Sequence, residues 1–196
     1  MLIHLVRHGH HALLGTTLCG RMPGVRLDEL GCRQMAHVAE LIARSSPVAV
    51  QSSPQQRTLQ SASIIASACG SALEIAPAFD EINMGRWTGA RFSDLAADPK
   101  WQRWNDSRGT ACPPRGESMT ALQTRTVRHI EQLRGETGSI VIVSHAEPIR
   151  AALMHYLKIP LDLFHTVTID PASISTISLE GNARGVVSRL NVGVTA

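Results

Sequence analysis

The chain has 196 residues, of which 43% are hydrophobic and 18% are charged, and its formal net charge is +3. This composition indicates a globular protein with a substantial core, and the weak, scattered positive charge and the lack of any run of about 18 apolar residues argue against nucleic-acid binding and a membrane span. The four cysteines lie far apart without CxxC spacing, so we expect no zinc site and no disulfide framework, but reduced thiols in a cytoplasmic protein.

The first predicted element is a strand over residues 2–6, a short apolar run that is followed by Arg7, His8 and Gly9. Such a run predicts a buried strand, and the glycine ends it. The polar side chains interrupt the run too early for a signal peptide. Arg7 and His8 are therefore expected at the carboxyl end of a strand, where open α/β sheets bind ligands. A cation beside an imidazole there indicates an anionic substrate and a histidine that acts as a nucleophile or transfers protons.

Helices and strands alternate along the next part of the sequence, after a loop rich in glycine and threonine over residues 10–25. The apolar pattern predicts in order a helix, a strand, a helix and a strand, over residues 27–44, 48–50, 55–69 and 73–75. Pro54 suits the start of the second helix, and Gly70 ends it. This alternation predicts an α/β fold with right-handed crossover connections.

Residues 80–116 break the alternation, because they contain three prolines, several glycines and all three tryptophans. We predict an irregular excursion with short helices here, which forms a partial lid over the site. The pattern then predicts a helix, a strand, a helix and two or three final strands, over residues 117–134, 140–144, 148–157, 163–169, 173–179 and 185–191. Gly181-Asn182 fits a hairpin turn between the last two strands.

The predicted strand over residues 140–144, like the first strand, is followed directly by a histidine, His145. Two strands would thus place two imidazoles at one edge of the sheet. Arg57 lies in the first turn of the helix at 55–69. If strand 48–50 pairs beside the first strand, Arg57 points at the same edge, where the helix N-terminus favours phosphate. Two guanidinium groups around two imidazoles would form a cradle for phosphate oxygens, whereas an ordinary exposed arginine is the alternative.

Two carboxylates, Asp80 and Glu81, begin the irregular excursion. Phosphoryl transfer from an oxygen ester needs an acid that protonates the leaving alkoxide, and a carboxyl with a raised pKa can serve. Both residues qualify on chemistry alone, and both could equally be solvated loop carboxylates.

The cluster of His8, His10 and His11 raises the question of a metal site. In an extended chain the side chains of His10 and His11 point in different directions, and no acidic residue accompanies them before Asp28. We therefore expect no bound metal.

Four sequence blocks, in this order, resemble the histidine phosphatase superfamily, which includes cofactor-dependent phosphoglycerate mutases, alpha-ribazole phosphatases and fructose-2,6-bisphosphatases. The blocks are Leu5-Val6-Arg7-His8-Gly9, Ser52-Ser53-Pro54 with Arg57, Gln60 and Ala62, Glu81 with Gly85, Trp87 and Gly89, and Val143-Ser144-His145 with Arg150. Lesser matches are Gly20-Arg21, Gly31 and Gly116-Glu117-Ser118. The resemblance implies one domain over residues 1–196, built as three α/β/α layers around a mostly parallel sheet.

The resemblance also implies a mechanism. His8 would be the nucleophile that forms a phosphohistidine, and Glu81 would be the acid for the leaving group and then the base for water. Arg7, Arg57 and His145 would bind the phosphoryl oxygens, with His145 also counted among the catalytic residues. The implied activity is a metal-independent phosphatase for small phosphomonoesters, with no cofactor. Three further residues are expected to bind substrate: Arg21, Trp87 and Ala146.

The sequence departs from the superfamily pattern at several positions. Ala146 and Glu147 follow the second histidine, where Gly-Gly or Gly-Asp is common, and His10 occupies a position that is commonly acidic or small. Ala12, Leu13 and Leu14 lie where mutases typically carry polar residues, which favours a stand-alone phosphatase. Phosphoglycerate mutase-type transfer and binding of phosphorylated ligands without turnover stay as alternatives. The oligomeric state stays open, and a homodimer through the edge of the last strands is one option.

Overall fold

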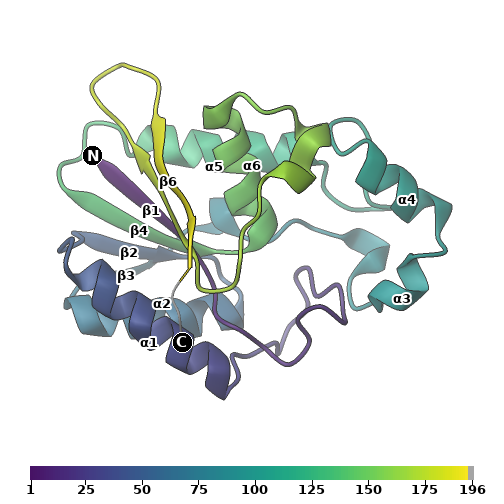
Figure 1. Cartoon of the computed structure of the whole chain (residues 1–196), viewed down its shortest axis with the longest axis horizontal. Helices are drawn as coiled ribbons and strands as arrows, with labels where there is room; N and C mark the ends of the chain where they lie inside the picture. Colours follow the sequence, from purple (N-terminus) through teal and green to yellow (C-terminus); the bar gives the residue numbers. More distant parts are fainter. Residues whose placement is uncertain (194–196) are drawn as a thin grey trace.

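A computed structural model describes residues 1–193. Six strands form one mixed sheet in the order β3-β2-β4-β1-β5-β6 (Figure 1). Their bounds are Leu2–Arg7 (β1), Ala49–Ser52 (β2), Leu73–Ile75 (β3), Ser139–Ser144 (β4), Ile174–Ser178 (β5) and Val186–Val192 (β6). The first four are parallel to one another, β5 is antiparallel to β1, and β6 is antiparallel to β5. The predicted α/β fold with a mostly parallel sheet is confirmed.

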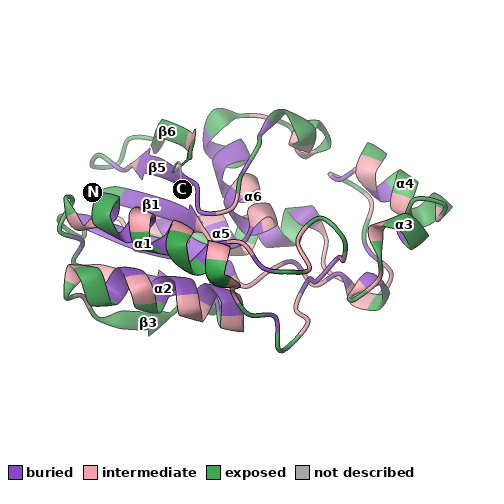
Figure 2. Ribbon diagram, turned by 60° about the horizontal axis from the view of Figure 1, so that its bottom comes forward, coloured by how far each residue is buried: buried purple, intermediate pink, exposed green. Residues whose placement is uncertain are grey.

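Four long helices cover the two faces of the sheet. They are Glu29–Ala43 (α1), Gln56–Cys69 (α2), Met119–Gln132 (α5) and Ala146–Leu157 (α6). The alternation of side chains along β4 explains the layers, because Val141 and Val143 pack with α1 and α2, whereas Ile140 and Ile142 pack with α5 and α6. Buried residues therefore run along the central strands between the helical layers (Figure 2). The predicted three-layer arrangement is confirmed.

The strand order brings the two histidine-bearing strands together. β1 pairs with β4 in parallel, with Arg7 opposite Ser144, so His8 and His145 leave adjacent strands at the same edge. β2 does not pair with β1, because β4 lies between them. Arg57 was expected at this edge if the strand before it paired with β1, but it reaches the edge in another way. β2 is parallel to β4, and the helix that follows β2 begins at the same end of the sheet.

The tail contains two strands rather than three. Leu161–Thr166 forms a 3₁₀ helix, and so the strand predicted over 163–169 is wrong. The backbone of this segment makes local hydrogen bonds, such as that from Leu163 N–H to the Pro160 carbonyl oxygen. It also has no free edge of β5 to pair with, because β1 and β6 lie on the two sides of β5. The predicted hairpin of the last two strands is confirmed, with Gly181 in its connection at a φ of 47°.

The excursion over 80–116 holds two short helices, Phe92–Leu95 (α3) and Pro99–Asp106 (α4), and the 3₁₀ turn Gly85–Trp87. A further 3₁₀ turn, Pro77–Phe79, directly precedes it. A small hydrophobic core of its own includes Trp87 and the fully buried Trp104, packed against residues of α5. The tryptophans thus attach the excursion to the rest of the molecule. Within residues 1–193, every helix is too short or too polar to cross a lipid bilayer.

Candidate active site

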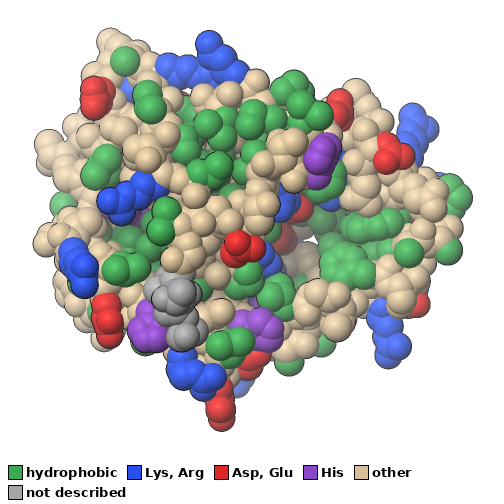
Figure 3. Space-filling view, in the orientation of Figure 1, with side chains coloured by type: hydrophobic (Ala, Val, Ile, Leu, Met, Phe, Trp, Pro, Cys, Tyr) green, Lys and Arg blue, Asp and Glu red, His purple; other side chains and the backbone are tan. Residues whose placement is uncertain are grey.

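A cavity of about 370 Å³ opens at the carboxyl edge of the sheet, between the sheet and the excursion. Figure 3 shows this face hollowed there, with charged side chains deep in the hollow. Arg7, His8, Arg57 and Glu81 line the cavity, as does Ala146. His145 is fully buried beside His8, with ring centroids 5.2 Å apart. The structure thus brings residues of the four sequence blocks, from Arg7 to His145, together at one cavity.

Two glycines shape the turn that carries His8. A Cβ on Gly9 would lie 2.5 Å from the Gly31 carbonyl oxygen, and a Cβ on Gly31 would lie 2.2 Å from the carbonyl oxygen of His10. The turn after β1 can therefore pack directly against the start of α1 only because both residues lack a side chain. This contact fixes the position of the His8 backbone.

The His8 ring is oriented for attack through one nitrogen. Its Nδ1 lies 2.8 Å from the Gly9 carbonyl oxygen and donates its proton there, which leaves the lone pair on Nε2. Burial holds the pKa of His8 well below its usual value, and the positive charges of Arg7 and Arg57 lower it further. His8 is therefore neutral near pH 7, which is the state of a nucleophilic imidazole.

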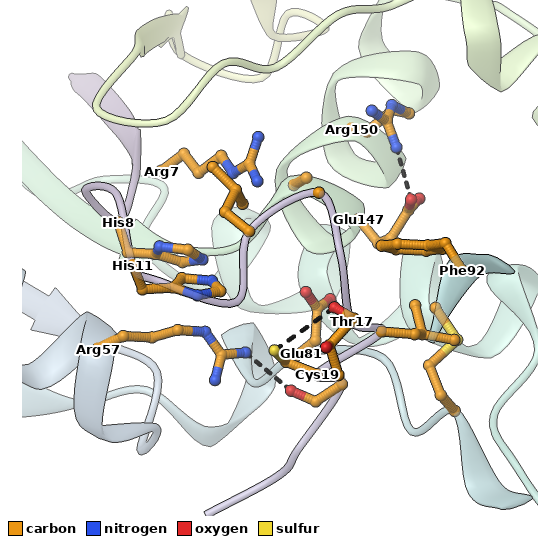
Figure 4. A pocket seen from close by; sticks show the side chains of 16 residues that line it. Arg7, His8, His11, Thr17, Cys19, Arg57, Glu81, Phe92, Glu147 and Arg150 are labelled. Atoms are coloured by element: carbon orange, nitrogen blue, oxygen red, sulfur yellow. Dashed lines mark hydrogen bonds and ion pairs between the residues drawn. The ribbon is translucent and has the colours of Figure 1, made fainter. Parts of the chain in front are cut away.

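Arg57 carries a buried guanidinium group and Arg7 a half-buried one, and both have unused donors (Figure 4). Arg7 Nη1 donates to the Ile169 carbonyl oxygen at 2.7 Å, and Arg57 Nη2 donates to that of Gly20 at 2.8 Å. Nε of Arg7 and both Nε and Nη1 of Arg57 are buried without a partner among the described residues. Burial lowers the pKa of both groups, but arginine stays charged in proteins. Together they form a positive, desolvated site for an anion.

His145 is held from behind by Ser53. Its Nε2 lies 2.8 Å from Ser53 Oγ, while its Nδ1 has no hydrogen-bond partner in the described chain and is 3.9 Å from Oε2 of Glu81. Burial holds its pKa well below the usual value, and the charge of Arg57 and the His8 ring lower it further. The ring is neutral and has one nitrogen free beside His8.

The structure separates the two carboxylates that the sequence left open. Glu81 lines the cavity, and burial raises its pKa to about 7 against the opposing effect of Arg57. Asp80 instead accepts hydrogen bonds from the Glu81 N–H and the Gln55 side chain, both at 2.8 Å, and pairs with Arg21. Glu81 is therefore the one of these two carboxyls that faces the cavity and has a raised pKa.

Two of the residues expected to bind substrate do not line the cavity. Arg21 donates to the Glu81 carbonyl oxygen at 2.6 Å and pairs with Glu117 at 3.1 Å, so its guanidinium is used to hold the loop of Glu81. The indole of Trp87 is buried and donates to Asp98 at 3.1 Å. Both side chains are engaged in contacts within the chain, so their role in substrate binding stays a prediction.

Glu147 is part of a buried charge cluster that sequence reasoning missed. Its carboxylate lies 2.6 Å from Arg150 and 3.1 Å from Arg108, and these two charges overcome the effect of burial and lower its pKa to about 2. The Arg108 guanidinium lies over the Phe164 ring at 3.7 Å from its centroid. The sequence does indicate the pair of Glu147 and Arg150, because residues three positions apart lie on the same face of a helix. Arg108 comes from the excursion, and no sequence pattern links it to Glu147.

We expect Glu147→Ala to lower the free energy of unfolding by about 3–5 kcal/mol, because it leaves the buried guanidinium of Arg108 and the partly buried guanidinium of Arg150 without their counter-charge. Urea denaturation at pH 7 measures this loss. Glu40→Ala, at an exposed position of α1, is the control and should change stability by less than about 0.5 kcal/mol. Because the folded-state pKa is depressed, the stabilisation by Glu147 is present above about pH 4.3 and is lost as pH falls towards 2. The free energies of unfolding of the wild type and of Glu147→Ala, measured as a function of pH, should therefore converge near pH 2.

The sequence model of the histidine phosphatase superfamily (branch 1) matches residues 3–192. The chain belongs to this superfamily. As a histidine phosphatase it is a hydrolase of the phosphatase type. Phosphoserine phosphatase 1 of Hydrogenobacter thermophilus is 28% identical over 170 residues, which cover 85% of this chain and 80% of that protein. The probable phosphoglycerate mutase GpmB of Yersinia pestis is 29% identical over 182 residues, covering 91% and 85% of the two chains.

The fold of this histidine phosphatase agrees with solved structures. That of the mycobacterial glucosyl-3-phosphoglycerate phosphatase Rv2419c with VO3 has a TM-score of 0.87 and 22% identity, and the likeness covers 98% of this chain and 99% of that one. The chain spans only 52% of the length of some mycobacterial relatives, among them the bifunctional protein Rv2228c of Mycobacterium tuberculosis. Among residues 1–193, no group of three or more His, Cys, Asp or Glu side chains is placed to hold a metal ion.

Proposed function

We propose that this protein hydrolyses small phosphomonoesters without a metal or cofactor, through a phosphohistidine on His8. The observation that carries the proposal is the set of buried nitrogens on Arg7, Arg57 and His145 that have no partner among residues 1–193. Arg7 and Arg57 line the same cavity as His8, and the His145 ring lies beside the His8 ring. Unpaired buried donors cost stability, and a phosphoryl group with several oxygens would satisfy them together. Ala146 then offers a small side chain at the wall of the cavity.

In the first step, Nε2 of His8 would attack phosphorus while the bond from phosphorus to the ester oxygen breaks. The Glu81 carboxyl gives its proton to that oxygen, and the alcohol leaves. We assign the Ser53 hydroxyl proton to Nε2 of His145 at 2.8 Å rather than to Asp80 Oδ1 at 3.3 Å. The Nδ1–H of His145 would then donate to a phosphoryl oxygen beside the two guanidinium groups. These donors stabilise the charge of the transition state.

In the second step, the Glu81 carboxylate would take a proton from water, whose oxygen attacks phosphorus. The bond between phosphorus and Nε2 breaks, and phosphate and neutral His8 result. A carboxyl with a pKa near 7 suits both duties, because both of its protonation states are populated near neutral pH.

A phosphatase for small metabolites is supported by the similarity to phosphoserine phosphatase 1 and by the fold shared with the glucosyl-3-phosphoglycerate phosphatase. The similarity to GpmB supports phosphoglycerate mutase-type transfer as a second candidate. The apolar side chain of Leu14 in the cavity wall favours the phosphatase, because it offers a phosphorylated product no polar contact that would keep it bound for a return transfer. We further propose that residues 1–196 form one domain and that the protein acts in the cytoplasm, where its four unpaired cysteines would stay reduced.

Phosphate release from a panel of phosphomonoesters in EDTA tests the proposal. We expect turnover that is unchanged by EDTA or by added Mg²⁺ and that needs no bisphosphate primer. Loss of turnover in EDTA would contradict the metal-independent mechanism. Activity that appears only with a bisphosphate primer would identify a mutase, and binding of phosphorylated ligands without turnover would identify a binding protein.

A further inference from the structure

His11 is a buried histidine of the cavity for which the proposed mechanism has no use. Its side chain lines the cavity and is only 3% exposed. A turn in which Leu14 N–H donates to the His11 carbonyl oxygen follows directly. The neighbouring His10 points away, because its Nδ1 pairs with Asp28 at 2.5 Å. The two adjacent imidazoles therefore serve different surroundings, and only that of His11 belongs to the cavity.

The His11 ring differs from the other buried histidine rings in having no hydrogen bond within residues 1–193. His4 pairs with Thr176 at 3.1 Å, and the rings of His8 and His145 pair with Gly9 and Ser53. Nδ1 of His11 is buried without a hydrogen-bond partner among the described residues, and Nε2 makes no hydrogen bond to them either. A buried imidazole that uses neither nitrogen is costly unless a bound ligand supplies a partner.

The position of the ring indicates which ligand this is. The centroids of His11 and His8 are 5.3 Å apart with the planes tilted by 37°, and Figure 4 shows both rings directed into the cavity above Arg57. A phosphoryl group bound between Nε2 of His8 and the Arg57 guanidinium would therefore lie next to the His11 ring. Its oxygens are acceptors, and the ring has a donor to offer.

We infer that His11 is a further phosphoryl-binding residue, whose imidazole N–H donates a hydrogen bond to an oxygen of the group that is transferred to His8. The inference rests on the proposed function, since it adds a contact to the same site. Burial, together with the charges of Arg57 and Arg7, lowers the pKa of His11 to about 4, so the ring is neutral. A neutral donor adds a hydrogen bond without adding a positive charge beside the nucleophile.

The test is the affinity of the full-length protein for inorganic phosphate and for vanadate, measured by calorimetry and by inhibition. His11→Phe keeps a ring of similar shape without a donor, and His11→Gln keeps an N–H donor. We expect His11→Phe to weaken vanadate binding about 10- to 100-fold and His11→Gln to weaken it by less than about 5-fold. His129→Phe, which removes a half-buried histidine outside the cavity, is the matched control and should bind vanadate like the wild type.

Vanadate binding by His11→Phe at wild-type affinity would overturn the inference and leave His11 as a packing residue. Should His11→Phe fail to fold, the ring nitrogen resonances of the ¹⁵N-histidine-labelled wild type decide instead. They are assigned by comparison with His11→Gln, and we expect the His11 resonances to shift on titration with phosphate; an unchanged His11 ring would refute the contact. Because these experiments measure binding, they are separate from the proposed function, which fails if His8→Ala still turns over.

Discussion

Replacing His8 by alanine is expected to lower kcat/KM for phosphomonoesters by about 10⁴-fold or more, because no other group takes over the covalent step. In the wild type, Nδ1 of His8 is fixed by the Gly9 carbonyl and the pKa of the ring is held low, so that Nε2 is a free lone pair at neutral pH. Rapid quenching with a ³²P-labelled ester should trap an acid-labile, base-stable phosphoenzyme in the wild type and none in His8→Ala.

His10→Ala is the matched control for this experiment. His10 is two residues away, partly exposed and paired with Asp28, so its loss should leave most of the activity. Thermal unfolding of both variants checks that they are folded. A phosphoenzyme that persists in His8→Ala would contradict the assignment of the nucleophile, whereas loss of activity in both variants would indicate that the turn after β1 as a whole had been disturbed.

Replacing Glu81 by glutamine is expected to slow the hydrolysis of alkyl phosphates by about 10²- to 10⁴-fold, because glutamine cannot protonate the leaving alkoxide. The phosphorylation of His8 by an aryl phosphate with an acidic phenol should survive, since this leaving group needs no proton. The second step still needs a base, so Glu81→Gln should show a burst of one phenol per enzyme followed by slow turnover. Stopped-flow kinetics with p-nitrophenyl phosphate measures the burst.

The pH dependence gives a second measure of Glu81. Its pKa is raised to about 7, so the acid form dominates below that pH and disappears above it. The rate constant of His8 phosphorylation by an alkyl phosphate should therefore fall as pH rises through 7 in the wild type, and this fall should be absent in Glu81→Gln. Asp80→Asn is the control, and because Asp80 lies outside the cavity lining, its effect should not depend on the leaving group. A loss in Asp80→Asn that depends on the leaving group would exchange the roles of the two carboxylates.

The sequence by itself determined the elements whose signals are local. The apolar runs before His8 and His145 form buried strands, and the periodic segments form α1, α2, α5 and α6, because burial of a stripe or a face requires that spacing wherever the segment packs. Arg7, His8, Arg57 and Glu81 could be named as candidates from the sequence because each lies beside the end of such an element or within a short block of fixed spacing, and all four line one cavity. Residues 163–169 were misassigned because an apolar pattern of this length does not distinguish a strand from a short helix.

Only the tertiary structure decided which segments lie side by side. It placed β4 between β1 and β2, and it gave Asp80 and Glu81 different surroundings, because the hydrogen bonds of Asp80 and the burial of Glu81 come from parts of the chain that are distant in sequence. It also placed Arg21 in a hydrogen bond with the Glu81 carbonyl oxygen and Arg108 in an ion pair with Glu147. The pKa and charge state of a side chain depend on its burial and on the charged groups near it in space, and the sequence alone does not give those distances.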